Sequence, residues 1–400
     1  YTSGTTGPPK GCQLTHGNFR AELAGVRGMF PDLFDREDSS TMLFLPLAHV
    51  FARIIQVGAI RWGTVLSHSS EVRDLSSRLR DLQPTFLLAV PSVYQEIFNS
   101  ASNQAWSDGK GRAFDKAART AIAWSRAIQD GRSPSVALRS KHALYSRLVY
   151  SKIRESLGGK IDAAISGGAP LGERLGHFYR GIGINLLEGY GLTETTGALT
   201  ANTLTEQRIG TVGKPLPHTE VRVNIHGELE FRGPQVFSGY LNNDEATHAA
   251  ITEDGWFATG DIGDIDQDGF VRVSGRKKEI IITAGGKNVA PAALEDRIRE
   301  NKLISQCLVV GDGKPFVAAV ITINPDAWDG EVTDPDLLDA VQKIVDDANG
   351  QVSRAESIRK FVIMPQDWTE ENGYLTPSMK LRRHAVLQDL HDTIESMYVR

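Results

Sequence analysis

The sequence predicts an α/β protein, in which a large N-terminal domain, present in part and carrying a β-rich subdomain, precedes a small α+β domain. Three observations favour this fold class. Short apolar runs alternate with segments of helical periodicity in the first part of the chain, as in α/β domains. Alternating residues and tight turns dominate about 205–275. From Arg276 onward, helical and strand patterns succeed one another over a length typical of a domain.

The first part of the chain is expected to hold buried strands between helices. Thr15-His16-Gly17-Asn18 predicts a helix start, because capping residues precede apolar residues at helical spacing. Residues 92–158 are basic and mostly helical without a catalytic pattern, which indicates a helical insertion or cover. Another helix is expected at 72–82. The expected buried strands are 41–45, 64–67, 85–89, 161–166 and 184–188.

The second part of the chain combines a β-rich subdomain with a C-terminal α+β domain. The strands expected in the subdomain are 221–225, 228–232, 270–274 and 279–283. In the C-terminal domain, helices are expected at 292–301, 337–348 and 383–397, and strands at 305–310 and 316–323.

Composition excludes several classes of protein. With 40% hydrophobic and 23% charged residues, the chain is typical of soluble globular proteins. A net charge of -5 without a long Lys/Arg block argues against nucleic acid as a partner. Cys12 and Cys307 lie far apart, which excludes a disulfide scaffold or zinc cluster and favours a reduced, cytoplasmic compartment.

Membrane contact and assembly are less constrained. No apolar run approaches the roughly 20 residues of a membrane-spanning helix. Peripheral membrane contact stays open, although no basic amphipathic helix compels it. The oligomeric state is unconstrained. Because no strand and no initiator Met precede Tyr1, we expect an N-terminally truncated chain.

The chain opens on a loop of hydroxyls, glycines and one lysine, whose composition is typical of phosphate binding. The pattern is not a Walker P-loop, since its glycines are too close and a glycine follows the lysine. A flexible linker is the alternative interpretation. The candidate phosphate-binding residues are Thr2, Ser3, Gly4, Thr5, Thr6, Gly7 and Lys10.

Three further segments carry candidate site residues at strand ends, where ligands gather in open α/β sheets. In Gly189-Tyr190-Gly191-Leu192-Thr193-Glu194-Thr195, Tyr190 offers a ring for base stacking, Thr193 a hydroxyl for phosphate and Glu194 an oxygen ligand for Mg²⁺. Gly167, Gly168 and Ala169 permit a ring or acyl chain to lie against the backbone. Asp261, after Gly260, suits the two hydroxyls of a ribose. An ordinary turn is the alternative for each segment.

Together and in this order, the segments resemble the adenylate-forming superfamily of acyl-CoA synthetases, adenylation domains and luciferases. The resemblance covers the whole chain and implies the adenylate-forming enzyme fold, with an AMP-binding domain at 1–275 and a C-terminal lid domain at 276–400. It implies that residues 1–11 and 189–195 bind the nucleotide and Mg²⁺, with Thr2 and Glu194 as metal ligands. Asp261 would bind ribose. In Gly275-Arg276-Lys277-Lys278-Glu279, Arg276 would contact the nucleotide and Lys278 would be the pivot of the lid.

Two segments are similar to long-chain fatty acyl-CoA synthetases of the bacterial type: Leu45-Pro46-Leu47-Ala48-His49-Val50-Phe51 and the stretch from Asn372 to Arg383. The resemblance implies that His49 flanks the carboxylate pocket and that Lys380 reaches the reacting carboxylate and α-phosphate. Gly286 would approach the pantetheine arm of CoA. The implied substrates are a fatty acid, ATP and CoA, with Mg²⁺ as cofactor.

Two alternatives stay open from the sequence. The protein could be an acyl-AMP ligase, or an aryl or amino acid adenylating domain, that loads a carrier protein. It could also be a nucleotide-binding fragment without turnover. Acyl chain length is not readable, because the residues of an acyl tunnel have no fixed spacing.

Overall fold

The N-terminal domain contains a five-stranded sheet and a separate pair of strands, and candidate site residues lie on or directly after strands of the larger sheet. The computed structural model describes residues 1–2, 9–69, 75–376 and 380–399. Strands β3 (Phe86–Ala89), β4 (Ala163–Ser166) and β5 (Asn185–Leu192) are parallel neighbours, and β6 (Gly197–Ala201) and β7 (Lys214–Pro215) continue this sheet in antiparallel register. Strands β1 (Ser40–Leu43) and β2 (Val65–His68) pair in parallel. The alternating pattern therefore folds into the expected α/β domain.

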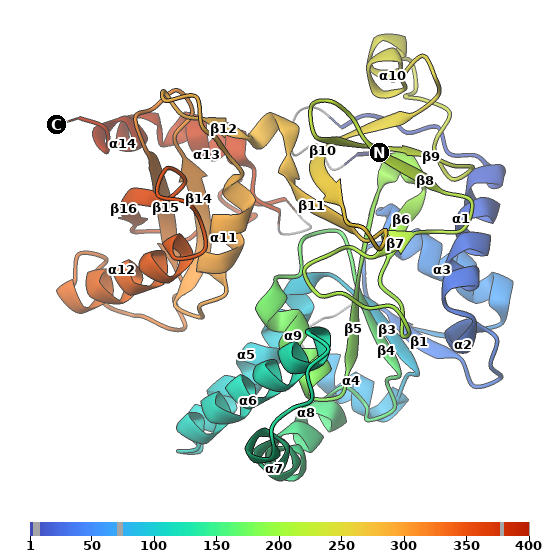
Figure 1. Cartoon of the computed structure of the whole chain (residues 1–400), viewed down its shortest axis with the longest axis horizontal. Helices are drawn as coiled ribbons and strands as arrows, with labels where there is room; N and C mark the ends of the chain where they lie inside the picture. The colour runs from blue at the N-terminus through green and yellow to red at the C-terminus, as the bar shows by residue number, and fades with distance from the viewer. Residues whose placement is uncertain (3–8, 70–74, 377–379, 400) are drawn as a thin grey trace.

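Helices cover this sheet, as the sequence predicts. The stretch at 92–158 is helical almost throughout, in Figure 1 the teal and green group below the sheet, including a short π-helical segment, Ser146–Tyr150. The helices of this domain are α1 (His16–Met29), α2 (Pro31–Phe34), α3 (Val50–Trp62), α4 (Leu75–Leu82), α5 (Pro91–Ser107), α6 (Gly111–Gln129), α7 (Val136–Tyr145), α8 (Ser151–Ser156) and α9 (Glu173–Gly181).

Buried tyrosines hold the helical group on the sheet. The Tyr94 hydroxyl donates to the Leu87 and Ile165 carbonyls at 3.3 and 3.1 Å, and the Tyr179 hydroxyl donates to the Tyr94 carbonyl at 2.7 Å. Both rings are fully buried. Each tyrosine therefore adds apolar burial while its polar end stays satisfied.

The β-rich subdomain is a four-stranded antiparallel sheet in the order β11-β10-β9-β8, with α10 (Asp244–Ala250) beside it. Its strands are β8 (Glu220–Val223), β9 (Glu228–Arg232), β10 (Phe257–Ile265) and β11 (Val271–Arg276). The expected strand at 279–283 is wrong in extent, because residues 277–279 form a 3₁₀ turn and only Ile281–Ile282 (β12) is extended, paired with Asn288–Val289 (β13).

The C-terminal domain is a three-stranded sheet with helices on both faces. Strand β15 (Val317–Ile323) lies between β14 (Ile304–Val310) and β16 (Ile358–Met364), and all its residues are buried. Helices α11 (Pro291–Arg299) and α12 (Pro335–Asn349) pack on one face, and α13 (Arg383–Asp389) and α14 (His391–Ser396) on the other. The single helix expected at 383–397 is therefore two helices. Figure 1 shows this domain beside the N-terminal one, to the left.

Candidate active site

Two hydrogen bonds between Thr2 and Lys10, one between backbone groups and one to the Thr2 hydroxyl, join the two ends of the opening loop. The Thr2 amide donates to the Lys10 carbonyl at 2.9 Å, and the Lys10 amide donates to the Thr2 hydroxyl at 2.9 Å. The predicted phosphate-binding residues Ser3, Gly4, Thr5, Thr6 and Gly7 lie outside the described residues. The structure therefore describes only the two ends of this loop, at Thr2 and Lys10.

Residues 11–13, directly after this loop, pair with residues 239–241, which brings Tyr240 close to the loop. Amides at Gln13 and Leu241 donate to the carbonyls of Gly239 and Gly11 at 2.9 and 2.8 Å. This pairing places the Lys10 ammonium 4.4 Å from the centre of the Tyr240 ring. A cation at this distance is attracted by the ring face.

Tyr240 also holds Glu194, the predicted metal ligand. Its hydroxyl donates to one carboxylate oxygen of Glu194 at 2.7 Å, while the Glu194 carbonyl accepts the Phe237 amide at 2.7 Å. Among the described residues, the other carboxylate oxygen of Glu194 has no hydrogen-bond partner, which suits Mg²⁺, a cation that takes one or two carboxylates besides water and substrate phosphates. No group of three or more His, Cys, Asp or Glu that could cage a metal occurs among the described residues.

Asp261 lies at the centre of a second cluster. It faces Arg276 across β10 and β11, and the Arg276 Nε lies 2.9 Å from its Oδ1. The Tyr190 hydroxyl donates to Oδ2 at 2.5 Å. Burial raises the pKa of Asp261, although Arg276 and Tyr190 act in the opposite direction. The carboxylate is therefore oriented by two protein donors, and its remaining lone pairs are the ones that a ribose could use.

The strand context of these residues corrects one expectation and excludes one alternative interpretation. Gly189-Tyr190-Gly191 does not follow a strand that ends at 188, because β5 continues to Leu192 and pairs with β6. Asp261 is not on a turn but within β10, beside a register shift. At Gly191 a Cβ atom would come 1.8 Å from the Gly197 carbonyl oxygen, so the close pairing of β5 and β6 requires glycine there.

Lys380 is coupled electrostatically to Arg276 and Asp261, and His49 is coupled in turn to Lys380. Burial lowers the pKa of Lys380, and Arg276 lowers it further, while Asp261 acts to raise it. Burial likewise lowers the pKa of His49, with Lys380 as the next cause. These couplings mean that the lysine of the C-terminal domain lies within electrostatic range of the nucleotide-side residues.

The residues after β4 border the same region. A Cβ atom on Gly167 would lie 3.6 Å from the Phe51 ring and 3.7 Å from the Gly189 carbonyl oxygen. Gly168 has φ +83°, and Ala169 is exposed. A hydrogen bond to a carboxylate on β5 holds the loop after β4 in place.

That carboxylate belongs to Glu188, which the sequence interpretation did not single out. It accepts the Leu171 amide at 3.0 Å, just beyond the small residues of the loop after β4. Burial raises the pKa of Glu188 to about 7. Its position directly before Gly189 was the only signal that could have marked it.

Two predicted residues stand apart from these clusters, and one borders them. Lys278 is exposed, and its side chain forms no hydrogen bond or ion pair with the described residues. Gly286, with φ +75°, is exposed in a turn in which its amide donates to the Thr283 carbonyl at 2.8 Å. Thr193 is half-buried at the start of the 3₁₀ turn that carries Glu194. The roles expected for Lys278 and Gly286 stay predictions.

Comparison with known proteins shows which family the chain matches. Residues 1–241 match the AMP-binding enzyme family, and residues 278–400 match the AMP-binding enzyme C-terminal domain. The long-chain-fatty-acid–CoA ligases FadD15 of Mycobacterium bovis and Mycobacterium tuberculosis are 50% and 49% identical to the chain over 413 residues, which cover 100% of this chain and 68% of each relative.

Solved structures share the fold at lower identity. ATP-bound MatB from Rhodopseudomonas palustris has a TM-score of 0.71 at 24% identity, over 98% of this chain and 68% of that one. O-succinylbenzoate CoA synthetase (MenE) from Bacillus subtilis, in complex with ATP and magnesium, has a TM-score of 0.69 at 22% identity, over 96% of this chain and 68% of that one.

Proposed function

Because the chain belongs to the AMP-binding enzyme family, we propose that it activates a long-chain fatty acid with ATP and joins it to CoA, releasing AMP and pyrophosphate. In the first step a carboxylate oxygen attacks the α-phosphorus, and the bond to the pyrophosphate oxygen breaks. In the second step the CoA thiol loses its proton to solvent, and its sulfur attacks the acyl carbonyl and displaces AMP. The long-chain-fatty-acid–CoA ligases to which the chain is similar align with its whole length.

The observation that supports this proposal best is the Arg276–Asp261 ion pair, to which Lys380 is coupled electrostatically. Two anions must approach each other in the first step, so positive charge at the reacting atoms lowers the barrier. Lys380 is the cation on the lid side, and Arg276 is the one on the β-sheet side. A partly buried ammonium acts more strongly than an exposed one, because less water screens it.

The remaining residues position the nucleotide. We propose that Asp261, held by Tyr190 and Arg276, accepts the ribose hydroxyls, and that the Tyr190 ring lies near the base. Glu194 and Thr2 would hold Mg²⁺, which neutralises phosphate charge when bound. The small residues Gly167, Gly168 and Ala169 would border the adenine or the acyl carbonyl.

We further propose the division into an AMP-binding domain at 1–275 and a lid domain at 276–400. Lys278 would be the pivot between them, and Gly286 would face the pantetheine arm in a second orientation of the lid. Among the described residues, no helix has the length and apolarity needed to cross a membrane. A cytoplasmic location remains a prediction from the two distant cysteines.

A pyrophosphate-release assay tests the proposal. Acids of increasing chain length are supplied with ATP and Mg²⁺, with and without CoA. Release that requires a long-chain acid, together with CoA-dependent thioester formation, is the expected result. Thioester formation only on a carrier protein would replace the proposal with carrier loading. ATP binding without acid-dependent release would leave a nucleotide-binding protein without turnover.

A further inference from the structure

We infer that the solvent-facing side of α7 and of the π-helical segment after it docks on an anionic phospholipid surface. This α7 face is defined by Val136, Leu144 and Leu148 with Arg139, Lys141 and Arg147. The three apolar side chains are 79%, 55% and 59% exposed. No residue of α7 is buried. Large apolar side chains beside basic ones on one exposed surface offer two contacts that strengthen binding to a membrane, namely apolar insertion and attraction to anionic lipid.

The charge of the α7 face fits an anionic partner. Residues 131–154 contain six Lys or Arg and no Asp or Glu, in a chain whose net charge is -5. Within the part of the chain that the structure describes, Arg139, Lys141 and Arg147 form no ion pair. Their charges are therefore free to meet an external surface.

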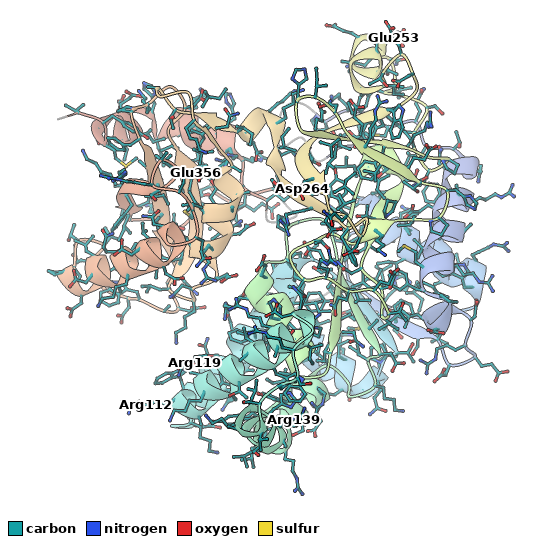
Figure 2. The ribbon with its side chains drawn as sticks, viewed as in Figure 1. Arg112, Arg119, Arg139, Glu253, Asp264 and Glu356 are labelled. Carbon is teal, nitrogen blue, oxygen red and sulfur yellow. The ribbon has the colours of Figure 1, made fainter. Side chains whose placement is uncertain are left out.

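The inner side of α7 is fastened to the body of the protein, so the α7 face is presented at a fixed angle. The His142 ring stacks on Trp124 of α6 with centroids 4.1 Å apart, and its Nε2 lies 2.6 Å from the Gly181 carbonyl oxygen. Figure 1 shows α7 at the lower edge of the molecule. In Figure 2, Arg112 and Arg119 of α6 lie along the same lower part as Arg139, and all three are exposed.

The positive charge of the α7 face also argues against a second copy of the chain as its binding partner. Two α7 faces in contact would bring arginines and lysines of the same sign together, which is unfavourable across an interface. Anionic headgroups instead attract each basic side chain, and shallow insertion of the three apolar side chains removes them from water. The inference does not depend on the substrate proposed above, since binding to a vesicle needs no turnover.

Vesicle sedimentation tests the inference, with vesicles of phosphatidylcholine alone and of phosphatidylcholine mixed with phosphatidylglycerol. We expect binding to the mixed vesicles only, weakened by salt. Since each basic residue near an anionic surface strengthens binding by about fivefold, Arg139→Gln/Lys141→Gln/Arg147→Gln should weaken it by about 100-fold. Val136→Ser/Leu144→Ser/Leu148→Ser should weaken it at least tenfold.

Matched controls keep the result specific. Arg20→Gln/Arg61→Gln/Lys343→Gln removes the same charge from exposed positions elsewhere, and Ile60→Ser replaces an apolar side chain that is 80% exposed. Both should bind like the unmodified protein, and all variants are checked by circular dichroism. Equal binding to both vesicles, equal loss in the controls, or an oligomer that the α7 variants dissociate would overturn the inference.

Discussion

The candidate site depends on pairs of residues that are far apart in the sequence. Tyr240 orients Glu194, and Tyr190 and Arg276 orient Asp261. Residue chemistry singled out Glu194 and Asp261 as candidates, because carboxylates in such motifs suit metal and ribose ligands, whereas Arg276 and Lys380 were proposed from the family resemblance. It missed Tyr240, since nothing in the sequence shows that residues 11–13 pair with 238–241. A tyrosine in an ordinary turn carries no signal of its own.

Lys380→Ala tests the role of the lid lysine. We expect acid-dependent ATP/pyrophosphate exchange to fall about 100- to 1000-fold, since the loss of one stabilising donor at the reacting atoms costs about 2.7–4 kcal/mol. CoA transfer from supplied acyl-AMP should stay close to normal. Equal loss in both half-reactions would contradict the assignment.

The converse variant is Gly286→Trp. A Cβ atom at Gly286 meets no other atom within 4 Å, so bulk there is tolerated apart from the strain of the positive φ. Thioester formation should fall at least tenfold while pyrophosphate exchange is retained. Normal CoA transfer, measured on supplied acyl-AMP, would exclude the proposed pantetheine path.

Glu22 makes the stability of the protein depend on pH. Burial raises the pKa of this carboxyl to about 8, although the Ala198 amide donates to it at 2.6 Å. The folded state therefore binds a proton that the unfolded state releases near its ordinary pKa. As pH rises from about 4.5 to 8, this group lowers the free energy of unfolding by roughly 1 kcal/mol per pH unit.

Glu22→Gln should remove this dependence. Urea unfolding at pH 5, 6.5 and 8 should give a flatter profile for the variant, with its largest relative gain at pH 8. Glu253→Gln, at the exposed glutamate labelled in Figure 2, is the control and should follow the unmodified protein. Parallel profiles for Glu22→Gln and the unmodified protein would contradict the role of this carboxyl.

At the scale of elements, local signals predicted well where they act within a few residues. Thr15 caps α1, with its hydroxyl accepting the Asn18 amide at 3.1 Å and its amide donating to the Asn18 side chain at 2.8 Å. Strands β10 and β16 were not predicted. Gly260 and Gly263 interrupt β10, and Arg359-Lys360 interrupt the apolar alternation of β16. Pairing with neighbouring strands, β9 and β11 for β10 and β15 for β16, stabilises their extended backbone despite these interruptions.

Asn18→Ala tests how far the cap of α1 reaches into the tertiary structure. The buried amide group of Asn18 also donates to the Pro234 and Val236 carbonyls at 2.9 and 2.8 Å. Losing these bonds and the cap should lower the free energy of unfolding by about 2–3 kcal/mol in urea titrations. His16→Ala, at an exposed position of the same turn, should change it by less than about 0.5 kcal/mol. Similar losses in both variants would argue against a long-range role.

On the scale of the whole molecule, the two domains are joined by contacts outside the site. An Nη of Arg174 on α9 donates to the Glu300 carbonyl at 2.9 Å, and its Nε lies 3.4 Å from a Glu300 carboxylate oxygen. Glu300 ends α11, where the helix dipole favours a cation. The Lys302 ammonium lies 5.5 Å from the centre of the Trp106 ring on α5. These contacts join the C-terminal domain to α5 and α9, and we propose that they stabilise the orientation in which Lys380 is coupled to Asp261.

Arg174→Ala should therefore separate the half-reactions. We expect ATP/pyrophosphate exchange to fall about tenfold, because fewer molecules hold the lid in this orientation, while CoA transfer from supplied acyl-AMP stays the same or rises. Arg174→Lys keeps the charge without the forked geometry and should lie between the two. A proportional fall in both half-reactions would show a general loss of folding instead.

The sequence by itself determined the fold class, the long helical cover and the residue types of the nucleotide site, because periodicity, glycines and charged motifs act locally. Only the tertiary structure decided which residues meet. It coupled Lys380 electrostatically to Arg276 and Asp261, placed Asp261 within a strand, joined Glu194 to Tyr240 by a hydrogen bond and left the α7 face exposed. The physical reason is that burial, screening and ion pairing depend on neighbours in space, and those neighbours come from segments up to hundreds of residues apart.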